Sequence, residues 1–173
     1  MTIVLIGYMA SGKSSIGKRL AKKLNYNFID LDDFIEEKEN MSVTQIFKNK
    51  GEVYFRNQEA RYLKDLLNNN ANTILAVGGG TPCYSGNMEC ILSTKDVRSV
   101  YLKASLSALA KKLMEKKAKR PLIAHIDTLE EMTEFIGKHL FERMPFYEQA
   151  QTHISIDGKT KDEVTNELAS KLL

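Results

Sequence analysis

The sequence contains no tryptophan, only 3 prolines and only 2 cysteines among its 173 residues. Cys83 and Cys90 have no partner histidines nearby, so neither a zinc site nor a disulfide framework is indicated. No apolar run approaches the roughly 18 residues that a membrane helix needs. The short run at 2–6 also lacks the basic flank of a signal peptide. We therefore expect a cytoplasmic protein with no membrane partner.

An excess of charge of one sign is also missing. Lys and Arg total 25 and Asp and Glu total 22, which leaves a formal net charge of +3. We expect no nucleic-acid partner, because such proteins usually present a basic stripe. Hydrophobic residues make up 43% and charged residues 27%, a composition that can bury a core. The length fits one domain, which we expect to be a monomer.

Short apolar runs alternate with longer helical patterns. The runs typical of strands are 2–6, 27–30, 73–77, 97–102 and 153–156, and helical patterns occupy about 16–24, 52–68, 105–117, 128–142 and 160–172. Residues 42–45, Ser-Val-Thr-Gln, have capping-box spacing and predict the start of a further helix. Buried strands separated by helices predict a three-layer α/β fold around a five-stranded parallel sheet.

Residues 7–14, Gly-Tyr-Met-Ala-Ser-Gly-Lys-Ser, match the phosphate-loop pattern G-x-x-x-x-G-K-[ST]. The motif follows an apolar strand and opens an amphipathic helix, so backbone N–H groups and the helix dipole can hold an anion. Lys13 is expected to reach the β- and γ-phosphates, and the Ser14 hydroxyl to ligate Mg²⁺. The residues predicted to bind the nucleotide here are Ala10, Ser11, Gly12, Lys13, Ser14 and Ser15. The domain is therefore predicted to be P-loop NTPase-like.

A phosphate loop alone does not separate a GTPase, a motor ATPase and a kinase. The guanine-reading Asn-Lys-x-Asp is absent, and the third strand ends in three glycines instead of a metal-binding acid. Carboxylates follow the second strand instead, at Asp30 and Asp32. In an extended segment these two point the same way, so one could lie near Mg²⁺ and the other accept a proton from an alcohol. N-capping of the next helix is the competing role, which Asp33 would serve.

Four further strings follow in a recognisable order. They are residues 51–59 (Gly-Glu-Val-Tyr-Phe-Arg-Asn-Gln-Glu), 78–80 (Gly-Gly-Gly), 119–122 (Lys-Arg-Pro-Leu) and 143–148 (Arg-Met-Pro-Phe-Tyr-Glu). Together with the phosphate loop and Asp30-Leu31-Asp32, they make the chain, from residue 2 to about 156, resemble the shikimate kinase family.

The resemblance implies Mg²⁺-dependent transfer of phosphate from ATP to the 3-hydroxyl of shikimate, giving 3-phosphoshikimate and ADP in chorismate and aromatic amino acid biosynthesis. It implies one kinase domain over 1–173. The implied parts are a core of about 1–31, 70–111 and 128–173, a substrate-binding helical insertion of about 32–62 and a mobile lid of about 112–127.

The resemblance also implies roles for individual residues. Asp30 would help to hold the Mg²⁺ hydration shell, Asp32 would be the base, and Arg120 would close over ATP from the lid. The implied catalytic residues are Lys13, Asp32 and Arg120; the implied substrate ligands are Asp32, Arg56, Gly79, Gly80 and Arg143; the implied metal ligands are Ser14 and Asp30. Two arginines suit a small carboxylate substrate, because a guanidinium binds a carboxylate through two parallel hydrogen bonds.

Structural roles compete with some of these assignments. Arg56 could pair with Glu52 or Glu59 on its own helix, and Arg143 could be a cation at a helix C-terminus. Lys111 is expected near the adenine, where the family often has arginine, and residues 157–159 match no clear family pattern. Ala10 and Ser15 stand where the family commonly has Gly and Thr, and we expect both changes to be tolerated.

Two other functions compete with the kinase assignment. One is another small-molecule kinase, such as a gluconate or nucleoside monophosphate kinase, and the other is a non-catalytic nucleotide-binding module. The two arginines disfavour a nucleoside acceptor, and the 51–56 string disfavours gluconate. The presence of Lys13, Asp32 and Arg120 together disfavours a silent module.

Overall fold

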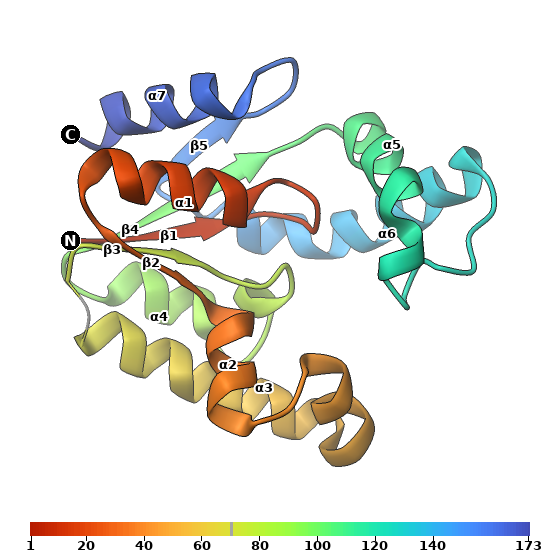
Figure 1. The fold of residues 1–173 in the computed structure, drawn as a ribbon, viewed down its shortest axis with the longest axis horizontal. Helices are drawn as coiled ribbons and strands as arrows, with labels where there is room; N and C mark the ends of the chain where they lie inside the picture. The colour runs from red at the N-terminus through yellow and green to blue at the C-terminus, as the bar shows by residue number, and fades with distance from the viewer. Residues whose placement is uncertain (70) are drawn as a thin grey trace.

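The computed structural model describes residues 1–69 and 71–173. Three asparagines at 68–70 follow the helical pattern predicted over 52–68 and would be expected to end it, but Asn70 lies outside the described residues. Five parallel strands form one sheet in the order β2-β3-β1-β4-β5 (Figure 1). Their bounds are β1 Thr2–Ile6, β2 Asn27–Asp30, β3 Thr73–Ala76, β4 Val97–Lys103 and β5 Thr152–Ser155. Each coincides with a predicted strand to within a residue or so, which confirms the predicted parallel sheet.

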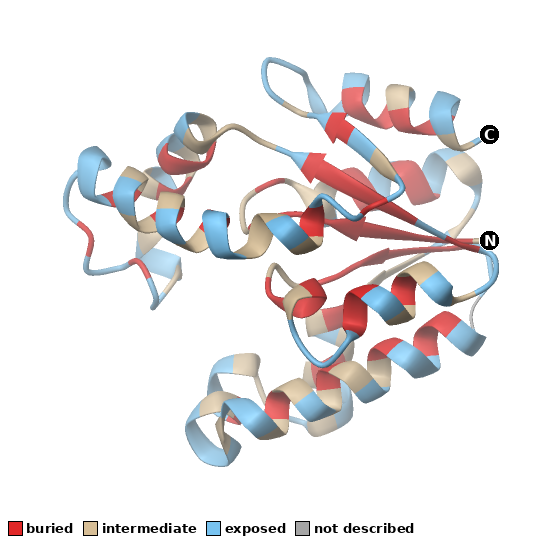
Figure 2. Ribbon diagram, turned by 180° about the vertical axis from the view of Figure 1, so that it is seen from behind, coloured by how far each residue is buried: buried red, intermediate tan, exposed pale blue. Residues whose placement is uncertain are grey.

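Helices cover both faces of the sheet. α1 (Lys13–Leu24) and α7 (Lys161–Leu172) pack on one face, and α3 (Val43–Asn69) and α4 (Asn87–Ser93) lie on the other (Figure 1). The central strand β1 is buried on both sides, since Ile3 and Leu5 join the core under α1 and α7 while Val4 and Ile6 join the opposite core. Figure 2 shows the strands as the buried centre of the molecule. The three-layer α/β fold is therefore as predicted.

α2 (Leu31–Glu39) and the first part of α3 project beyond the carboxyl end of β2 (Figure 1). α2 follows that strand directly, and α3 is broken at Gly51, whose φ of 86° and ψ of 167° are not helical. The predicted capping box is present, because Gln45 N–H donates to the Ser42 hydroxyl and Ser42 N–H donates to the Gln45 side chain. The left-handed φ at Gly51 is one that glycine adopts without steric cost.

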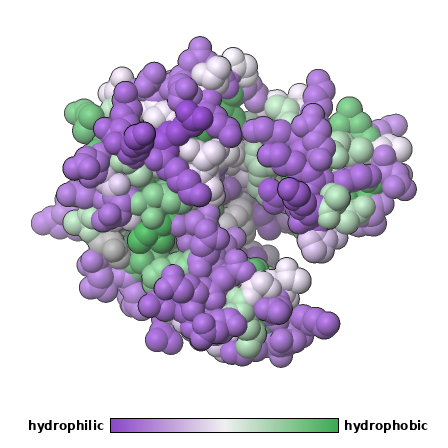
Figure 3. All heavy atoms as spheres, in the orientation of Figure 1, coloured by the Kyte–Doolittle hydropathy of each residue, from purple (hydrophilic) through white to green (hydrophobic). Residues whose placement is uncertain are grey.

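A second projection lies beyond the carboxyl end of β4 (Figure 1). It consists of α5 (Leu106–Lys116), the short 3₁₀ turn η2 (Lys117–Lys119) and α6 (Leu129–Tyr147). Residues 112–116 of the predicted lid therefore still belong to α5. Figure 3 shows the molecule hollowed between this projection and the body formed by α2 and α3.

The helix predicted over 128–142 extends further, to Tyr147, and passes through Pro145. Pro145 lacks the N–H that would bond the carbonyl of Phe141, and Phe141 is exposed to solvent. The buried side chain of Tyr147 fixes the last turn to the core. Tertiary packing thus outweighs the proline signal in the sequence.

The two cysteines lie outside the strands. Both are free, Cys83 in the 3₁₀ turn η1 (Thr81–Cys83) and Cys90 in α4. Within the described ranges, no helix has both the length and the apolar character that crossing a bilayer requires.

Candidate active site

The phosphate loop joins β1 to α1 and encloses the ammonium group of Lys13. Lys13 Nζ donates to the carbonyls of Gly7 at 2.7 Å and Tyr8 at 2.9 Å. Enclosure of this ammonium lowers the pKa of Lys13 to about 8, against the opposing effect of the carboxylates of Asp32 and Asp30. The loop is thus shaped around a cation that can turn toward a bound phosphate.

Two residues of the loop have left-handed backbone. Gly12, at φ 87°, precedes the first turn of α1, and Ala10 has φ 64°. Glycine adopts this conformation freely, whereas an L side chain costs about 1 kcal/mol or more. The commonly found glycine at position 10 therefore has a conformational reason, and this chain tolerates alanine there with some strain.

A cavity of about 450 Å³ opens above the loop. The predicted site residues that line it are Ala10, Gly12, Lys13, Ser14, Ser15, Asp30, Asp32, Gly79 and Arg120. Ser11 does not line it, because its side chain is buried inside the loop. Residues brought by β1, β2, β3 and the segment after α5 therefore meet at one place.

Asp30 and Ser14 form the candidate metal-binding pair. The Ser14 hydroxyl donates to Asp30 Oδ2 at 2.6 Å, while Asp30 Oδ1 accepts the backbone N–H groups of Asp32 and Asp33. Two adjacent oxygen donors suit Mg²⁺, which is usually held by one or two carboxylates together with substrate phosphates. Among the described residues, no group of three or more His, Cys, Asp or Glu could hold a metal ion by itself.

The same contacts correct two predictions about this segment. Asp30, not Asp33, is the N-cap of α2. Asp32 lies in the first helical turn, so the extended i, i+2 geometry is not what brings both carboxylates to the cavity. Both carboxylates line the cavity because β2 ends at Asp30, at the carboxyl ends of the strands, and α2 begins at the next residue.

Asp32 has the electrostatic character of a base. Partial burial raises its pKa to about 6, with further raising by Asp30 and Glu59 and an opposing effect from Lys13. Its carboxylate also adjoins the glycine triplet, since a Cβ on Gly78 would lie 3.3 Å from Asp32 Oδ1. At neutral pH the group is ionised but close enough to titration to accept a proton.

The glycine triplet brings the two predicted arginines together. A Cβ on Gly79 would lie 3.0 Å from Arg143 Nη1, and one on Gly80 would lie 2.8 Å from Arg56 Nη2. Both guanidinium groups therefore approach consecutive backbone positions that only glycine leaves open. Gly79 and Gly80, which the resemblance implies as substrate ligands, make room for the two arginines in the structure.

Arg56 is largely neutralised by its own helix, which is the alternative that the sequence left open. Arg56 Nη1 lies 2.8 Å from Glu59 Oε1, and Nε lies 3.8 Å from Glu52 Oε1. Yet Nε is buried without a hydrogen-bond partner, and the Tyr84 ring covers the guanidinium at 4.0 Å. Within the part of the chain that the structure describes, the pairing thus leaves one buried donor of Arg56 without a hydrogen bond.

Arg143 differs from Arg56 because no carboxylate within ranges 1–69 and 71–173 forms an ion pair with it. Its guanidinium lies 5.8 Å from the centre of the Tyr8 ring and contacts the Tyr147 hydroxyl. A cation with aromatic and backbone neighbours and no paired anion is a suitable partner for an anionic ligand.

Sequence reasoning missed three lysines that line the nucleotide cavity, namely Lys112, Lys116 and Lys161. Lys112 Nζ donates to the carbonyl of Ala10 at 3.2 Å, whereas Lys111, expected near the adenine, is exposed and does not line this cavity. Part of the signal was present, because Lys112 and Lys116 are four residues apart on α5 and so share one helix face.

Comparison with known proteins agrees with this geometry. The shikimate kinase family model matches residues 9–173. The shikimate kinase of Flavobacterium johnsoniae is 46% identical over 96% of this chain and 95% of its own, and that of Azobacteroides pseudotrichonymphae is 39% identical over 98% of both.

Solved structures give the same answer. A shikimate kinase from Bacteroides thetaiotaomicron superposes with a TM-score of 0.89 at 34% identity, covering 99% of this chain and 98% of its own. One from Acinetobacter baumannii, in complex with shikimate, has a TM-score of 0.84 at 27% identity, with 99% and 92% coverage. These matches span the whole sheet and both projections, and the chain belongs to the shikimate kinase family.

Proposed function

We propose that this chain transfers the γ-phosphate of ATP to the 3-hydroxyl of shikimate, giving 3-phosphoshikimate and ADP for chorismate and aromatic amino acid biosynthesis. Membership of the shikimate kinase family makes it an ATP-dependent phosphotransferase. The observation that carries the choice of acceptor is the meeting of Arg56 and Arg143 at Gly79 and Gly80, beside Asp32. Two forked cations next to a base match a small substrate that carries both a carboxylate and a hydroxyl.

Proton transfer is assigned to Asp32. With a pKa of about 6, its carboxylate is free to accept the proton of the attacking hydroxyl at neutral pH. Arg56 and Arg143 would bind the substrate carboxylate and so orient the ring with this hydroxyl toward the phosphate loop. Fixing both ends of the acceptor lowers the entropic part of the barrier.

Mg²⁺ would be held by the Ser14 hydroxyl and, through its hydration shell, by Asp30, whose oxygens already lie 2.6 Å apart. When bound, it supplies positive charge to the phosphate groups of ATP. Lys13 and Arg120 add to this from the chain, and stabilise negative charge that grows on the transferring group.

The segment that carries Arg120 is proposed to act as a lid over about 112–127. Its hydrophobic side chains at Ile123 and Ile126 are buried, while Leu122 is exposed at 55%. Closure over the cavity would exclude water, which otherwise competes with the alcohol for the phosphate. The division into core, insertion and lid, the monomeric state and the cytoplasmic location stay predictions.

A coupled ADP-release assay tests the proposal. Mg·ATP is supplied with shikimate, gluconate or AMP in parallel, and turnover is expected with shikimate alone. Gluconate- or AMP-dependent turnover would favour another small-molecule kinase. Nucleotide binding without turnover on any acceptor would favour the non-catalytic module.

A further inference from the structure

One face of α6 is turned toward the phosphate loop. His139, Arg143 and Tyr147 follow one another at intervals of four residues, so they lie above one another on this face. Tyr147 donates its hydroxyl proton to the carbonyl of Gly79, and Arg143 approaches the same glycine. The third member, His139, has no part in the mechanism described so far.

His139 holds a tyrosine of the phosphate loop. Its Nδ1 and the Tyr8 hydroxyl are 2.8 Å apart, and the two rings meet edge to face with centroids 5.5 Å apart. Burial raises the pKa of Tyr8 to about 12, and burial together with Arg143 lowers that of His139. At neutral pH the bond therefore joins a neutral phenol to a neutral imidazole.

Tyr8 connects this histidine to Arg143. Its ring is only 1% exposed and lies under the Arg143 guanidinium. The backbone of Tyr8 serves the nucleotide side, since its carbonyl accepts from Lys13. The backbone of Tyr8 thus contacts Lys13, while its side chain lies at Arg143 and is contacted by His139.

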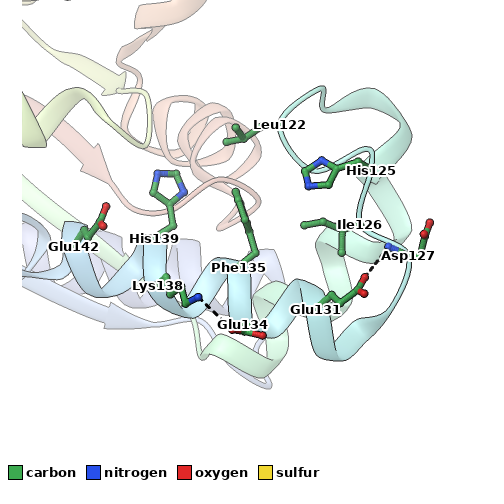
Figure 4. Close-up of a pocket in the computed structure, with 10 residues that line it drawn as sticks. All are labelled: Leu122, His125, Ile126, Asp127, Glu131, Glu134, Phe135, Lys138, His139 and Glu142. Atoms are coloured by element: carbon green, nitrogen blue, oxygen red, sulfur yellow. Dashed lines mark hydrogen bonds and ion pairs between the residues drawn. The ribbon is translucent and has the colours of Figure 1, made fainter.

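Packing alone does not fix His139. It lines a cavity of about 640 Å³ between α6 and residues 122–127. Figure 4 shows His139 and Phe135 projecting from α6 toward the side where Leu122 lies. The Phe135 ring also meets His139 edge to face, with centroids 6.0 Å apart, and the hydrogen bond to Tyr8 is the directional contact of the imidazole on the side of the phosphate loop.

We propose that His139 is a positioning residue for the acceptor substrate, acting through Tyr8 to hold Arg143 in place for the shikimate carboxylate. This inference rests on the proposed function. Losing the bond would free the phenol and loosen the ring on which the guanidinium rests. Arg143 is the more sensitive arginine, because no carboxylate among the described residues pairs with it.

The test compares steady-state kinetics of His139→Ala, Tyr8→Phe and the double variant. Each single change is expected to raise the KM for shikimate roughly three- to tenfold, the size of a net hydrogen-bond contribution. The KM for ATP and kcat should stay within about twofold, since the backbone of Tyr8 is untouched. The double variant should be no worse than either single one, because both remove the same bond.

Two further variants separate positioning from simple packing. His139→Asn places an amide oxygen close to where Nδ1 lies, and is expected to recover part of the lost affinity. Lys138→Ala is the matched control, because Lys138 lines the same cavity but is exposed and forms an ion pair within α6, with Glu134. It should leave both KM values unchanged.

Several results would overturn the inference. An equal rise in both KM values would mean that the whole phosphate loop has loosened. A lower melting temperature with an unchanged shikimate KM would show a packing role alone, and additive effects in the double variant would show two separate contacts. If Arg143→Ala raises the shikimate KM and His139→Ala does not, this inference fails while the proposed function stands. Absence of shikimate turnover in the unmodified protein overturns both.

Discussion

The two arginines at the acceptor site should respond differently to removal. Arg56→Ala and Arg143→Ala are both expected to raise the KM for shikimate strongly and to leave ATP binding nearly intact. Only Arg56→Ala should also destabilise the fold. The reason is Glu59, whose side chain is 1% exposed and lies 2.8 Å from Arg56.

The size of this difference follows from the burial of the pair. Removing one partner of a buried ion pair costs about 3–5 kcal/mol, because an uncompensated charge stays behind. Arg56 itself is 15% exposed, and the Thr81 hydroxyl still donates to Glu59, so we expect about 2–4 kcal/mol here. For a chain of this size that corresponds to a fall in melting temperature of roughly 4–16 °C. Arg143 has no such partner among residues 1–69 and 71–173, so its loss should cost well under about 1 kcal/mol.

Thermal and urea unfolding of the two variants, followed by circular dichroism, measure this difference directly. A third variant, Arg56→Ala with Glu59→Gln, removes the stranded charge and should recover part of the lost stability without recovering shikimate affinity. Equal stability of the two single variants would refute the reasoning. So would a double variant less stable than Arg56→Ala alone.

Three further outcomes are expected at the same site. The value of kcat/KM should fall below about pH 6, where Asp32 takes up a proton, and above about pH 8, where Lys13 loses one. A value of kcat/KM that does not fall at acidic pH would contradict the assignment of Asp32 as the base. Gly80→Ala should raise the shikimate KM roughly 10- to 100-fold by displacing the Arg56 guanidinium, and titration calorimetry should show ATP affinity unchanged. Arg120→Ala should lower kcat by up to about 10³-fold in single-turnover assays, and a change in ATP affinity alone would contradict its charge-stabilising role.

Some parts of the structure needed no tertiary information. The strand boundaries follow from short apolar runs, and the phosphate loop follows from a contiguous motif between a strand and a helix. Errors arose where a local signal met a tertiary contact. The helix predicted over 128–142 runs on to Tyr147 because that side chain is buried, and Asp30 instead of Asp33 caps α2 because the helix begins at the residue after Asp30.

The sequence by itself determined the fold, the phosphate loop and the family, because each depends on residue types at fixed short spacings or on the order of motifs. The tertiary structure decided which of the charged side chains remain available to bind an anionic ligand. Arg56 and Arg143 come from separate helices, α3 and α6. They meet at the glycines that follow β3, because the parallel crossovers bring these segments together at the carboxyl ends of the strands. That Arg56 is paired, that Arg143 is not, and that His139 reaches Tyr8 across 131 residues depends on burial and packing, which no local pattern encodes.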